Sequence, residues 1–312
     1  MFQPGLIQVA SFQRNVWVGT YYYVWYEAGL ASNHWNTSYA MVRDLPALGF
    51  YPSNNEATFH VHLSAMQEAG INLLIVSWWN ESAIDEATSN LFRYVSESEF
   101  RYSFKLALMV DVGNETLVDY GRAYDYVWKN YCVKYADLFF NWQDRPLLLF
   151  FNPVRPTVDT RFTVRTVGNQ PYANWNFWKA MSFLKDHAAR GDFNFTEYEG
   201  NPMISSDGVV NIIPRYDDSL LYAVGQRNYY MRADPELTDG LYQAQWEFVL
   251  RNRGSVQLVI IYSWNEHHER TAIEPLMTAN HLRDMTRIYT SKLNPHPTGS
   301  ITLESIFVTS AN

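Results

Sequence analysis

Short runs of apolar residues recur along the chain, and most of them are continuous rather than alternating with polar residues. Continuous runs rich in β-branched or aromatic residues are typical of strands that are buried on both faces of a parallel sheet. Such runs predict strands at Val16–Tyr23, Ile71–Ser77, Phe104–Asp111, Pro146–Asn152, Phe162–Val167, Val209–Pro214 and Val256–Trp264. A weaker run at Phe193–Tyr198 is the candidate for an eighth strand.

Segments with the helical period lie between most of these runs. They predict helices at Glu56–Ala69, Ala83–Glu97, Leu117–Tyr135, Trp175–Arg190 and Thr238–Asn252, and a closing helix from Leu276 to about Ser291. Gly70 directly follows the first of them, and glycine is a typical helix stop. Regular alternation of strand and helix predicts a parallel sheet covered by helices.

Polar and aromatic residues cluster directly after the predicted strands, which favours a barrel over a doubly wound sheet. In a barrel all the strand ends converge on one face, where the active site is built. No glycine-rich phosphate-binding turn follows the first strand. Since no linker or break in composition is visible, we predict one α/β domain. It is a single (β/α)₈ TIM barrel over residues 1–312, with a short C-terminal tail from about residue 293.

Composition and charge narrow the classes of protein. Apolar residues make up 47% of the chain, enough for a sizeable core, and the net charge of −8 argues against nucleic acid as partner. No run of about 18 uncharged apolar residues is present, so no membrane span is predicted. Cys132 is the only cysteine, which excludes an intrachain disulfide and a multi-cysteine zinc site. The oligomeric state is left open.

The first residues, Met1–Phe12, contain no basic region followed by an apolar stretch, so no signal peptide is visible. A soluble protein is expected. Its compartment is left open, because a secreted protein whose signal has been removed would look the same.

The aromatic content is high, with 11 Trp, 22 Tyr and 18 Phe. Tryptophan and tyrosine carry polar edges that need partners when buried, and sugar-binding clefts use both their flat faces and those edges. Clusters at strand ends therefore suggest a glycan cleft, although large core aromatics are the alternative. Tyr23, Trp25, Trp78 and Trp79 are the predicted substrate-binding aromatics.

Two carboxylates follow the last predicted strand, at Glu266 and Glu269. Glycoside hydrolysis needs one carboxyl group to protonate the leaving oxygen and a second to act at the anomeric centre. Confinement drives the pKa values of two carboxyl groups apart, so that one stays protonated near neutrality. The same spacing also occurs on solvated helices, but the position after a strand favours catalysis. Asn265 and His268 join the candidate site.

The stretch Trp264–Pro275 resembles a signature of glycoside hydrolase family 99, which usually reads Trp/Phe-Asn-Glu-Trp-His-Glu-Gly-Thr-Gln-Ile-Glu-Pro. Gly19–Tyr26 and Ala69–Trp79 are similar to the family's first strand and second strand region. The resemblance implies a (β/α)₈ barrel that cleaves internal α-mannosidic bonds with retention and without a catalytic metal or cofactor. It also implies Glu266 as the base toward the sugar's own 2-hydroxyl and Glu269 as the acid/base.

The sequence departs from that pattern in several places. His267 replaces the usual Trp, Arg270 the usual Gly and Ala272 the usual Gln. Arg270 would lower the pKa of Glu269 if it faced inward. Asp111 stands where a longer Glu is expected, and Asn152 is not followed by the family's aromatic and His residues. These departures leave open a related glycosidase that acts on a different polysaccharide.

Tyr216 and Asp217 follow another strand and are predicted hydroxyl ligands, although Asp217 could equally cap a helix. His60 and His62 lie in a predicted outer helix, where exposure to solvent is expected. Two alternative functions, each of a different class, remain. One is a metal-dependent hydrolase that uses the Glu266–Glu269 segment, and the other is a barrel that binds an oligosaccharide or polysaccharide without cleaving it.

Overall fold

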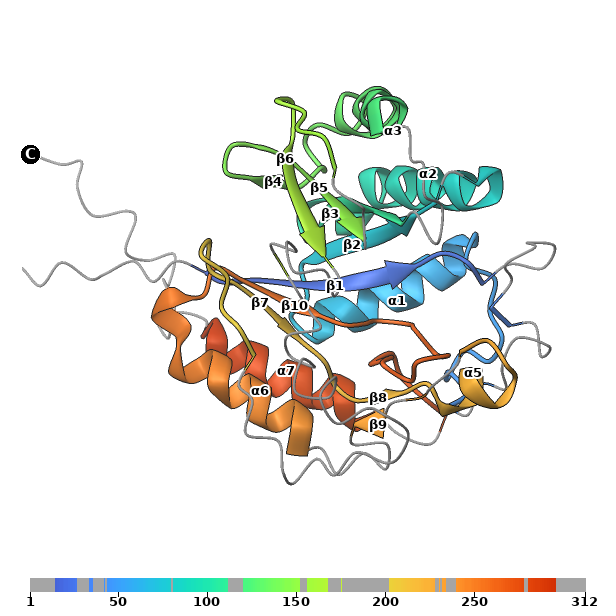
Figure 1. The fold of residues 1–312 in the computed structure, drawn as a ribbon, viewed down its shortest axis with the longest axis vertical. Helices are drawn as coiled ribbons and strands as arrows, with labels where there is room; N and C mark the ends of the chain where they lie inside the picture. The colour runs from blue at the N-terminus through green and yellow to red at the C-terminus, as the bar shows by residue number, and fades with distance from the viewer. Residues whose placement is uncertain are drawn as a thin grey trace, which may run out of the picture.

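The structure is a computed structural model that describes residues 15–26, 34–35, 42, 44–79, 81–111, 120–151, 156–167, 175, 202–227, 230, 232–233, 240–277 and 280–295. Strands and helices alternate along these ranges (Figure 1). The main strands are β1 (Trp17–Tyr23), β2 (Leu73–Trp78), β3 (Lys105–Asp111), β5 (Arg145–Phe151), β6 (Thr163–Val167), β7 (Val209–Ile212) and β10 (Leu258–Ile261). The main helices are α1 (Glu56–Glu68), α2 (Ser82–Glu97), α3 (Tyr120–Val127), α6 (Gly240–Arg251) and α7 (His281–Leu293).

Shorter elements connect them. They are the strands β4 (Asn141–Trp142), β8 (Tyr216–Asp217) and β9 (Arg232–Ala233), the helix α5 (Ser219–Ala223), and the helical turns η1 (Glu99–Tyr102), η2 (Trp128–Cys132) and η5 (Arg253–Ser255). The third predicted helix is divided, because α3 continues as the π-helical turn η2. The candidate strand Phe193–Tyr198 lies outside the described residues, as does the predicted helix after Trp175.

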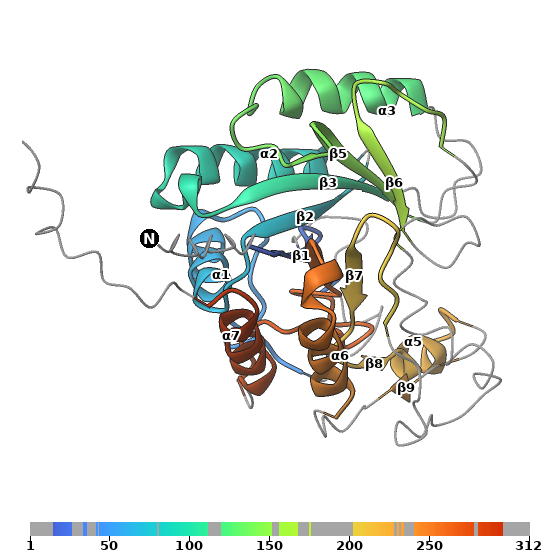
Figure 2. The same ribbon diagram turned by 90° about the vertical axis from the view of Figure 1, so that its left-hand side faces the viewer.

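One curled sheet forms the centre of the molecule. Its order is β4-β5-β3-β2-β1-β10-β7, with β6 also paired to β5, and every pairing is parallel except that of β4 with β5. Figure 2 shows α1, α2, α3, α6 and α7 on the outer side of the curl. The predicted α/β class is confirmed as a parallel half-barrel. A closed barrel and the assignment of the whole chain to one domain stay predictions.

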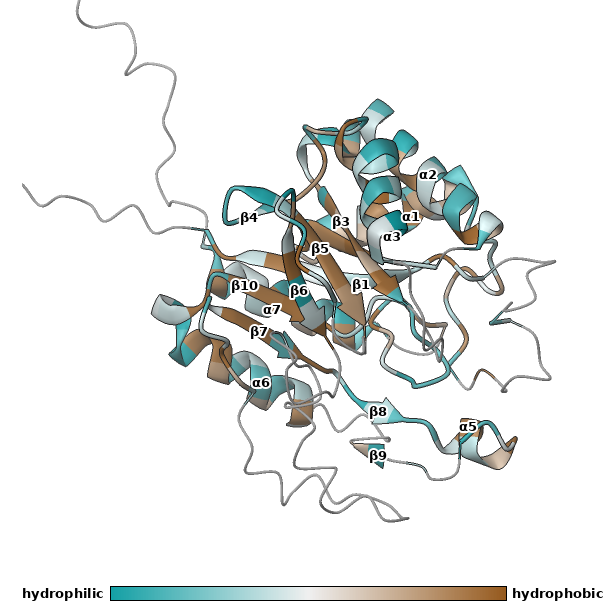
Figure 3. Cartoon of the chain, turned by 45° about the horizontal axis from the view of Figure 1, so that its top comes forward, coloured by the Kyte–Doolittle hydropathy of each residue, from teal (hydrophilic) through white to brown (hydrophobic). Residues whose placement is uncertain are grey.

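The strands are continuous apolar runs because both of their faces are covered. Every residue of β2, β7 and β10 is buried. Figure 3 shows hydrophobic strands between helices whose outer faces are more hydrophilic. Strands buried on both faces cannot alternate apolar with polar residues, which explains the sequence pattern. Among the described helices, none combines the length and the apolar character that crossing a membrane requires.

Helix α1 begins and ends where local chemistry requires. Asn55 caps its start, since the side-chain Oδ1 accepts hydrogen bonds from the backbone of Ala57 and Thr58 at 2.9 and 3.2 Å. Gly70 follows its end with φ +75°, a left-handed conformation that favours glycine. A Cβ at Gly70 would lie 2.5 Å from the Oγ1 of Thr290 in α7, so this glycine also allows the two helices to approach.

Asp207 joins the two edges of the curled sheet at the start of β7. Its carboxylate accepts hydrogen bonds from Arg165 of β6 at 2.9 Å, from the Nε1 of Trp175 at 3.0 Å and from the Nε1 of Trp142 at 3.2 Å. The backbone of Trp175 adds a second link, because its N–H donates to Thr166 and its carbonyl accepts from Asn211. Trp175 therefore lies between β6 and β7.

Candidate active site

The two candidate glutamates lie in a closed loop that follows β10. Ser263 and Thr271 are joined by a backbone hydrogen bond of 3.1 Å and by their side-chain hydroxyls at 3.0 Å. The Oγ of Ser263 also accepts from the backbone N–H of Glu266 at 2.9 Å. These bonds curl the chain into a buried turn rather than a solvated helix, so both carboxyl groups stay at the carboxyl end of the strands.

Glu266 is 4% exposed, and the backbone N–H groups of His268 and Glu269 donate to its carboxyl group. Its Oε1 accepts a hydrogen bond from the backbone N–H of His268 at 2.8 Å. Burial, followed by the neighbouring charge of Glu269, raises the pKa of Glu266 to about 8.

Glu269 has a different environment, rich in donors. Its Oε2 accepts from the hydroxyl of Tyr262 at 2.8 Å, and its Oε1 accepts from the hydroxyl of Tyr216 at 3.1 Å. The guanidinium of Arg227 also binds Oε1. Two buried carboxyl groups in one loop thus have surroundings of opposite kind, as acid–base chemistry requires.

Arg227, which was not foreseen, is the cation on Glu269. It follows α5 and also contacts Asp218 at 2.6 Å and Tyr216 at 2.7 Å. Arg270 points elsewhere, since its guanidinium binds Asp44 and lies 2.9 Å from Asp217. Arg270 has φ +55°, which suits the glycine that the family pattern has at this position.

Asp217 has mainly structural partners. Besides the ion pair with Arg270, its Oδ1 accepts from the backbone N–H and the hydroxyl of Ser219 at the start of α5. One of its oxygens therefore binds the first residue of α5, whose N-cap position is occupied by Asp218. Tyr216, in contrast, lies directly on Glu269.

A third buried glutamate, Glu274, links the loop to residues outside it. Its Oε1 accepts from the hydroxyl of Tyr51 at 2.7 Å and lies 2.6 Å from the Nε2 of His267. Its Oε2 lies 3.1 Å from the Nε2 of His62 in α1. His62 is buried, so the expected exposure to solvent was wrong for it; its other ring nitrogen lies 2.9 Å from the hydroxyl of Tyr22.

Asn265 fastens the loop to β1. Its side-chain oxygen accepts from the backbone N–H of Tyr23 at 2.9 Å, and its amide donates to the carbonyl of the same residue at 2.9 Å. Tyr23 also reaches the glutamates, because its side chain is hydrogen-bonded to Tyr262. Burial and the charges of Glu266, Glu269 and Asp111 raise the pKa of Tyr23. Asp111 therefore faces the same region, whereas Asn152 lies outside the described residues.

Two of the predicted aromatic residues, Tyr23 and Trp25, form a stack of rings with His34 and His268. Tyr23 stacks on Trp25 at 4.2 Å between ring centroids, Trp25 on His34 at 4.0 Å, and His34 on His268 at 4.6 Å. Both faces of Trp25 are thus covered by other rings. Trp79 meets the same indole edge-on at 5.7 Å. Trp25 can therefore offer a sugar its edge, but not a free face.

Trp78 is not brought to this cluster. Its Nε1 donates to Asp85 of α2 at 2.8 Å, and its ring stacks on Tyr126 of α3 at 5.6 Å between centroids. Alternation along β2 points Trp78 toward the helices, and Trp79 follows on the other side.

Among the described residues, His34, Glu266 and His268 form a group whose possible ligand atoms lie within 4.8 Å of one another, and it shares only Glu266 and His268 with the segment of the metal-dependent alternative. The two imidazole rings are stacked with an interplanar angle of 15°. Ligand lone pairs lie in the ring plane, so nearly parallel rings direct them along parallel lines. They cannot both meet one ion at about 2 Å. This arrangement does not fit a metal site.

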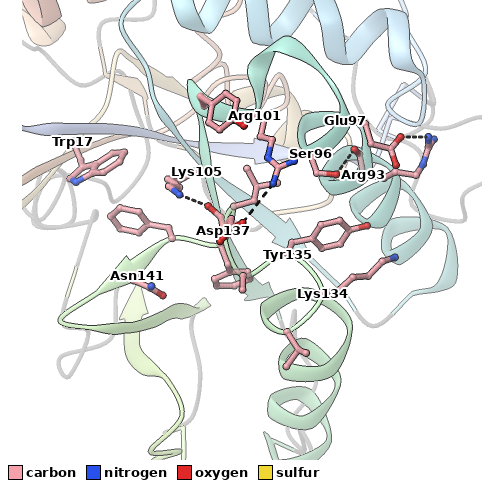
Figure 4. A pocket seen from close by; sticks show the side chains of 16 residues that line it. Trp17, Arg93, Ser96, Glu97, Arg101, Lys105, Lys134, Tyr135, Asp137 and Asn141 are labelled. Atoms are coloured by element: carbon pink, nitrogen blue, oxygen red, sulfur yellow. Dashed lines mark hydrogen bonds and ion pairs between the residues drawn. The ribbon is translucent and has the colours of Figure 1, made fainter.

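A cavity of about 1310 Å³ lies at the opposite end of the sheet, beside Lys105 at the start of β3 (Figure 4). Its two acidic side chains each face a cation, Glu97 with Arg93 at 3.5 Å and Asp137 with Arg101 at 3.6 Å. It therefore lacks the close carboxylate pair of the loop after β10. We place the candidate active site at that loop.

The fold is an α/β half-barrel, and two buried glutamates lie in one loop at the carboxyl end of its strands. No protein-family model and no curated protein matches the sequence. Two structures of the GH99 endo-α-mannosidase from Bacteroides thetaiotaomicron are similar, with TM-scores of 0.59 and 0.58, each at 16% identity. They cover 88% of this chain, and the match spans 96% and 97% of their own chains.

A structure described as a glycoside hydrolase-like protein is also similar, with a TM-score of 0.54 and 13% identity. That match covers 90% of this chain and 94% of the other. At such identities the comparison shows a common fold. It confirms, at the level of the fold, the resemblance to glycoside hydrolase family 99 that the motif after the last strand indicated.

Proposed function

We propose that the protein is a glycoside hydrolase related to family 99, with Glu266 and Glu269 as its catalytic pair. The observation that carries this proposal is that both carboxyl groups are buried in one loop, where Arg227 binds that of Glu269. The sequence motif around them and the similar fold support the assignment. We further propose that the half-barrel closes into an eight-stranded barrel between β6 and β7, where Trp175 contacts both edges.

The reaction proposed is retaining hydrolysis assisted by the sugar itself. One glutamate removes the proton of the 2-hydroxyl, whose oxygen attacks C1 while the C1–O bond to the leaving group breaks. The other glutamate donates its proton to the departing oxygen. That second glutamate then takes a proton from water, whose oxygen bonds to C1. The C1–O2 bond opens, and the first glutamate returns its proton to O2.

The proposed substrate is a polysaccharide or oligosaccharide with internal α-mannosidic bonds, as the motif and the names of the similar structures suggest. A related glycosidase acting on a different polysaccharide is the second candidate. It is favoured by Arg270, which pairs with Asp217 and so occupies a carboxylate that was predicted to bind sugar hydroxyls.

The substrate is tested by hydrolysis of a panel of α-mannans, mannose-rich oligosaccharides and β-glycans, with and without a chelator. Release of internal α-mannosidic fragments, unchanged by the chelator, is the expected result. Cleavage confined to another glycan would support a glycosidase but contradict the α-mannoside as its substrate. Activity lost on chelation would support the metal-dependent alternative, and binding without cleavage would support the non-catalytic one.

Trp79 and Trp78 provide a matched pair of variants for the sugar-binding role. In the described part of the chain, the buried indole N–H group of Trp79 has no hydrogen-bond acceptor, so we expect it to donate to a sugar hydroxyl. Trp79→Phe should raise KM about 5–10-fold, since a hydrogen bond contributes about 1 kcal/mol. Trp78→Phe should leave KM unchanged and destabilise the fold by about 1 kcal/mol, because it loses the bond to Asp85.

Steady-state kinetics and urea unfolding of both variants check this prediction. An unchanged KM in Trp79→Phe, or a raised KM in Trp78→Phe, would contradict the assignment of the two faces of β2.

A further inference from the structure

The turn that follows Glu269 is held by hydrogen bonds from outside the loop. Arg270, the next residue, has a left-handed backbone with φ +55°. The carbonyl of Glu269 accepts a hydrogen bond from the backbone N–H of Asp217 at 2.9 Å. The carbonyl of Arg270 accepts one from the Nε of Arg215 at 2.6 Å. The position of the Glu269 backbone therefore depends on two residues that lie just beyond β7.

Asp44, in the segment between β1 and α1, binds the side chains of both arginines. Its Oδ2 accepts from the Nη2 of Arg215 at 2.5 Å and from the Nε of Arg270 at 2.8 Å. Its Oδ1 accepts from the Nη2 of Arg270 at 3.2 Å. One carboxylate thus joins three parts of the chain, namely the segment after β1, the segment after β7 and the turn after Glu269.

These charges are largely removed from water. The side chain of Arg215 is 1% exposed and that of Asp44 is 17% exposed. Burial lowers the pKa of Arg215 to about 10; the charge of Asp44 opposes this shift, whereas the charge of Arg270 adds to it. Both guanidinium groups contact the same oxygen of Asp44. Without that carboxylate they would repel each other, because little water is present to screen them.

Asp217 cannot replace Asp44 in this arrangement. It lies 2.9 Å from the Nη1 of Arg270 and 3.6 Å from the Nε of Arg232, so its charge is shared between two other guanidinium groups. Among the described residues, the Nη1 of Arg215 is buried and has no hydrogen-bond partner. Asp44 is therefore the carboxylate on which Arg215 depends.

Arg270 also needs a partner for its own backbone. The family pattern has glycine at this position, and glycine adopts a left-handed backbone without strain. Any residue with a Cβ is strained there. The two bonds to Asp44 offset that strain and direct the guanidinium of Arg270 toward Asp44.

We propose that Asp44 is a positioning residue for Glu269, which it holds in place through Arg215 and Arg270. The inference rests on the proposed function and deepens it, because it takes Glu269 to be one of the reacting carboxyl groups. It holds whichever step Glu269 performs, because both proton-transfer roles need the carboxyl group at a fixed distance from the sugar.

Asp44→Asn keeps the shape of the side chain and removes its charge. The two guanidinium groups should then separate, and the carbonyl of Arg270 should lose its donor. Misplacement of a reacting group by about 1 Å can cost about 10²-fold in rate, so we expect kcat to fall about 10–100-fold. KM should change little, because the sugar-binding side chains do not contact Asp44. Steady-state kinetics on the cleaved glycan gives both constants.

Asp159→Asn is the matched control for the loss of an ion pair. Asp159 binds Arg161 through both carboxylate oxygens, at 3.0 and 2.6 Å, and its side chain is also 17% exposed. It lies before the start of β6, whereas the loop with Glu269 follows the carboxyl end of β10. Asp159→Asn should therefore leave both kcat and KM at their wild-type values.

Arg270→Gly separates positioning from a general loss of stability. It removes one of the two guanidinium groups that Asp44 holds together, and it supplies a residue that suits the left-handed turn. The fall in kcat caused by Asp44→Asn should therefore be about fivefold smaller in the Arg270→Gly background than in the wild type. Equal falls in the two backgrounds would contradict a role through Arg270.

Amide hydrogen exchange followed by NMR tests the same contacts without a glycan. The backbone N–H of Asp217, which is bound to the carbonyl of Glu269, should exchange about 10-fold faster in Asp44→Asn. It should be unchanged in Asp159→Asn. If exchange rises but the wild type cleaves no glycan, the proposed function fails and the link from Asp44 to the turn stands.

The opposite results would overturn the proposal. If glycans are cleaved but Asp44→Asn changes neither kcat nor exchange, the proposed function stands and the role of Asp44 falls. A raised KM with unchanged kcat would make Asp44 a substrate-binding residue instead. If Asp44→Asn does not fold, Arg215→Lys takes its place, since lysine keeps the charge but lacks the planar fork that binds Asp44 and the carbonyl of Arg270 together. Wild-type kcat and exchange in Arg215→Lys would equally overturn the proposal.

Discussion

Glu269→Gln and Glu266→Gln are each expected to lower kcat/KM on the cleaved glycan by about 10²–10⁴-fold. Glutamine keeps the size of the side chain but neither accepts nor delivers a proton at the required step. Both positions are buried in the loop after β10, so no neighbouring water can easily replace the lost group. The double variant should be little worse than either single variant, because the two groups act as a unit.

Initial rates on the substrate identified from the glycan panel check this prediction. Glu247→Gln is the matched control, since Glu247 lies on α6 with its side chain 45% exposed, beside Arg251. That variant should keep wild-type kcat/KM. Full activity in Glu269→Gln or Glu266→Gln would mean that the substituted glutamate has no role in the reaction, and would favour a different site.

Glu274→Gln is expected to destabilise the protein by about 3–5 kcal/mol, the range seen when one partner of a buried ion pair is removed. The carboxylate of Glu274 joins His62 of α1 to His267 of the loop after β10, and both contacts are buried. In the Gln variant an NH₂ group replaces one of the two carboxylate oxygens. This NH₂ group is a hydrogen-bond donor, and it would face at least one of the donors that now bind the oxygens of Glu274. Urea unfolding at neutral pH gives the difference in free energy.

The same contact has a defined pH dependence. Burial alone would raise the pKa of Glu274, but His62 and His267 outweigh it and lower the pKa from 4.5 to about 2. A carboxyl group with a depressed folded pKa stabilises the fold above its unfolded pKa. That contribution, about 3 kcal/mol, is lost as the pH falls from about 4.5 toward 2.

The difference in unfolding free energy between wild type and Glu274→Gln should therefore be largest above about pH 5 and shrink toward pH 3. Glu68→Gln is the control, because Glu68 lies at the end of the same helix as His62 with its side chain 68% exposed. It should change stability by less than about 1 kcal/mol at any pH. A pH-independent difference for Glu274→Gln would mean that its ion pairs contribute nothing.

The strands could be predicted because burial on both faces leaves a direct mark on the sequence. β10 is apolar throughout and β2 is apolar except for Ser77, and their predicted ranges, Ile71–Ser77 and Val256–Trp264, overlap the observed ones. The pairing of β1 with β10 follows from the chain order of a curled parallel sheet. The end of helix α1 could also be predicted from the local sequence, because the positive φ at Gly70 favours a residue without Cβ.

The site was only partly predictable, because its partners are far apart in the chain. Glu266 and Glu269 were found from their spacing and position, but Arg227 lies 42 residues before Glu269 with no motif around it. His62 was missed for a similar reason. Its helical position suggested solvent, whereas tertiary packing places it against Glu274. A buried His on a helix face could have suggested a carboxylate partner.

The aromatic residues show a second limit of sequence reasoning. Trp25 and Trp79 contact each other, but composition could not reveal that Tyr23 and His34 stack on Trp25. Trp78 and Trp79 are neighbours in sequence, and only the pleat of β2 determines which one turns toward the helices.

The most direct test of the central claim, retaining hydrolysis by the glutamate pair, is the stereochemical course of the reaction followed by ¹H NMR. The wild-type protein is mixed with the α-mannan or mannose-rich oligosaccharide that it cleaves, and the newly formed reducing end is observed before mutarotation. The account predicts that the α-anomer appears first. First appearance of the β-anomer would mean direct attack by water on C1, and would contradict the mechanism proposed for Glu266 and Glu269.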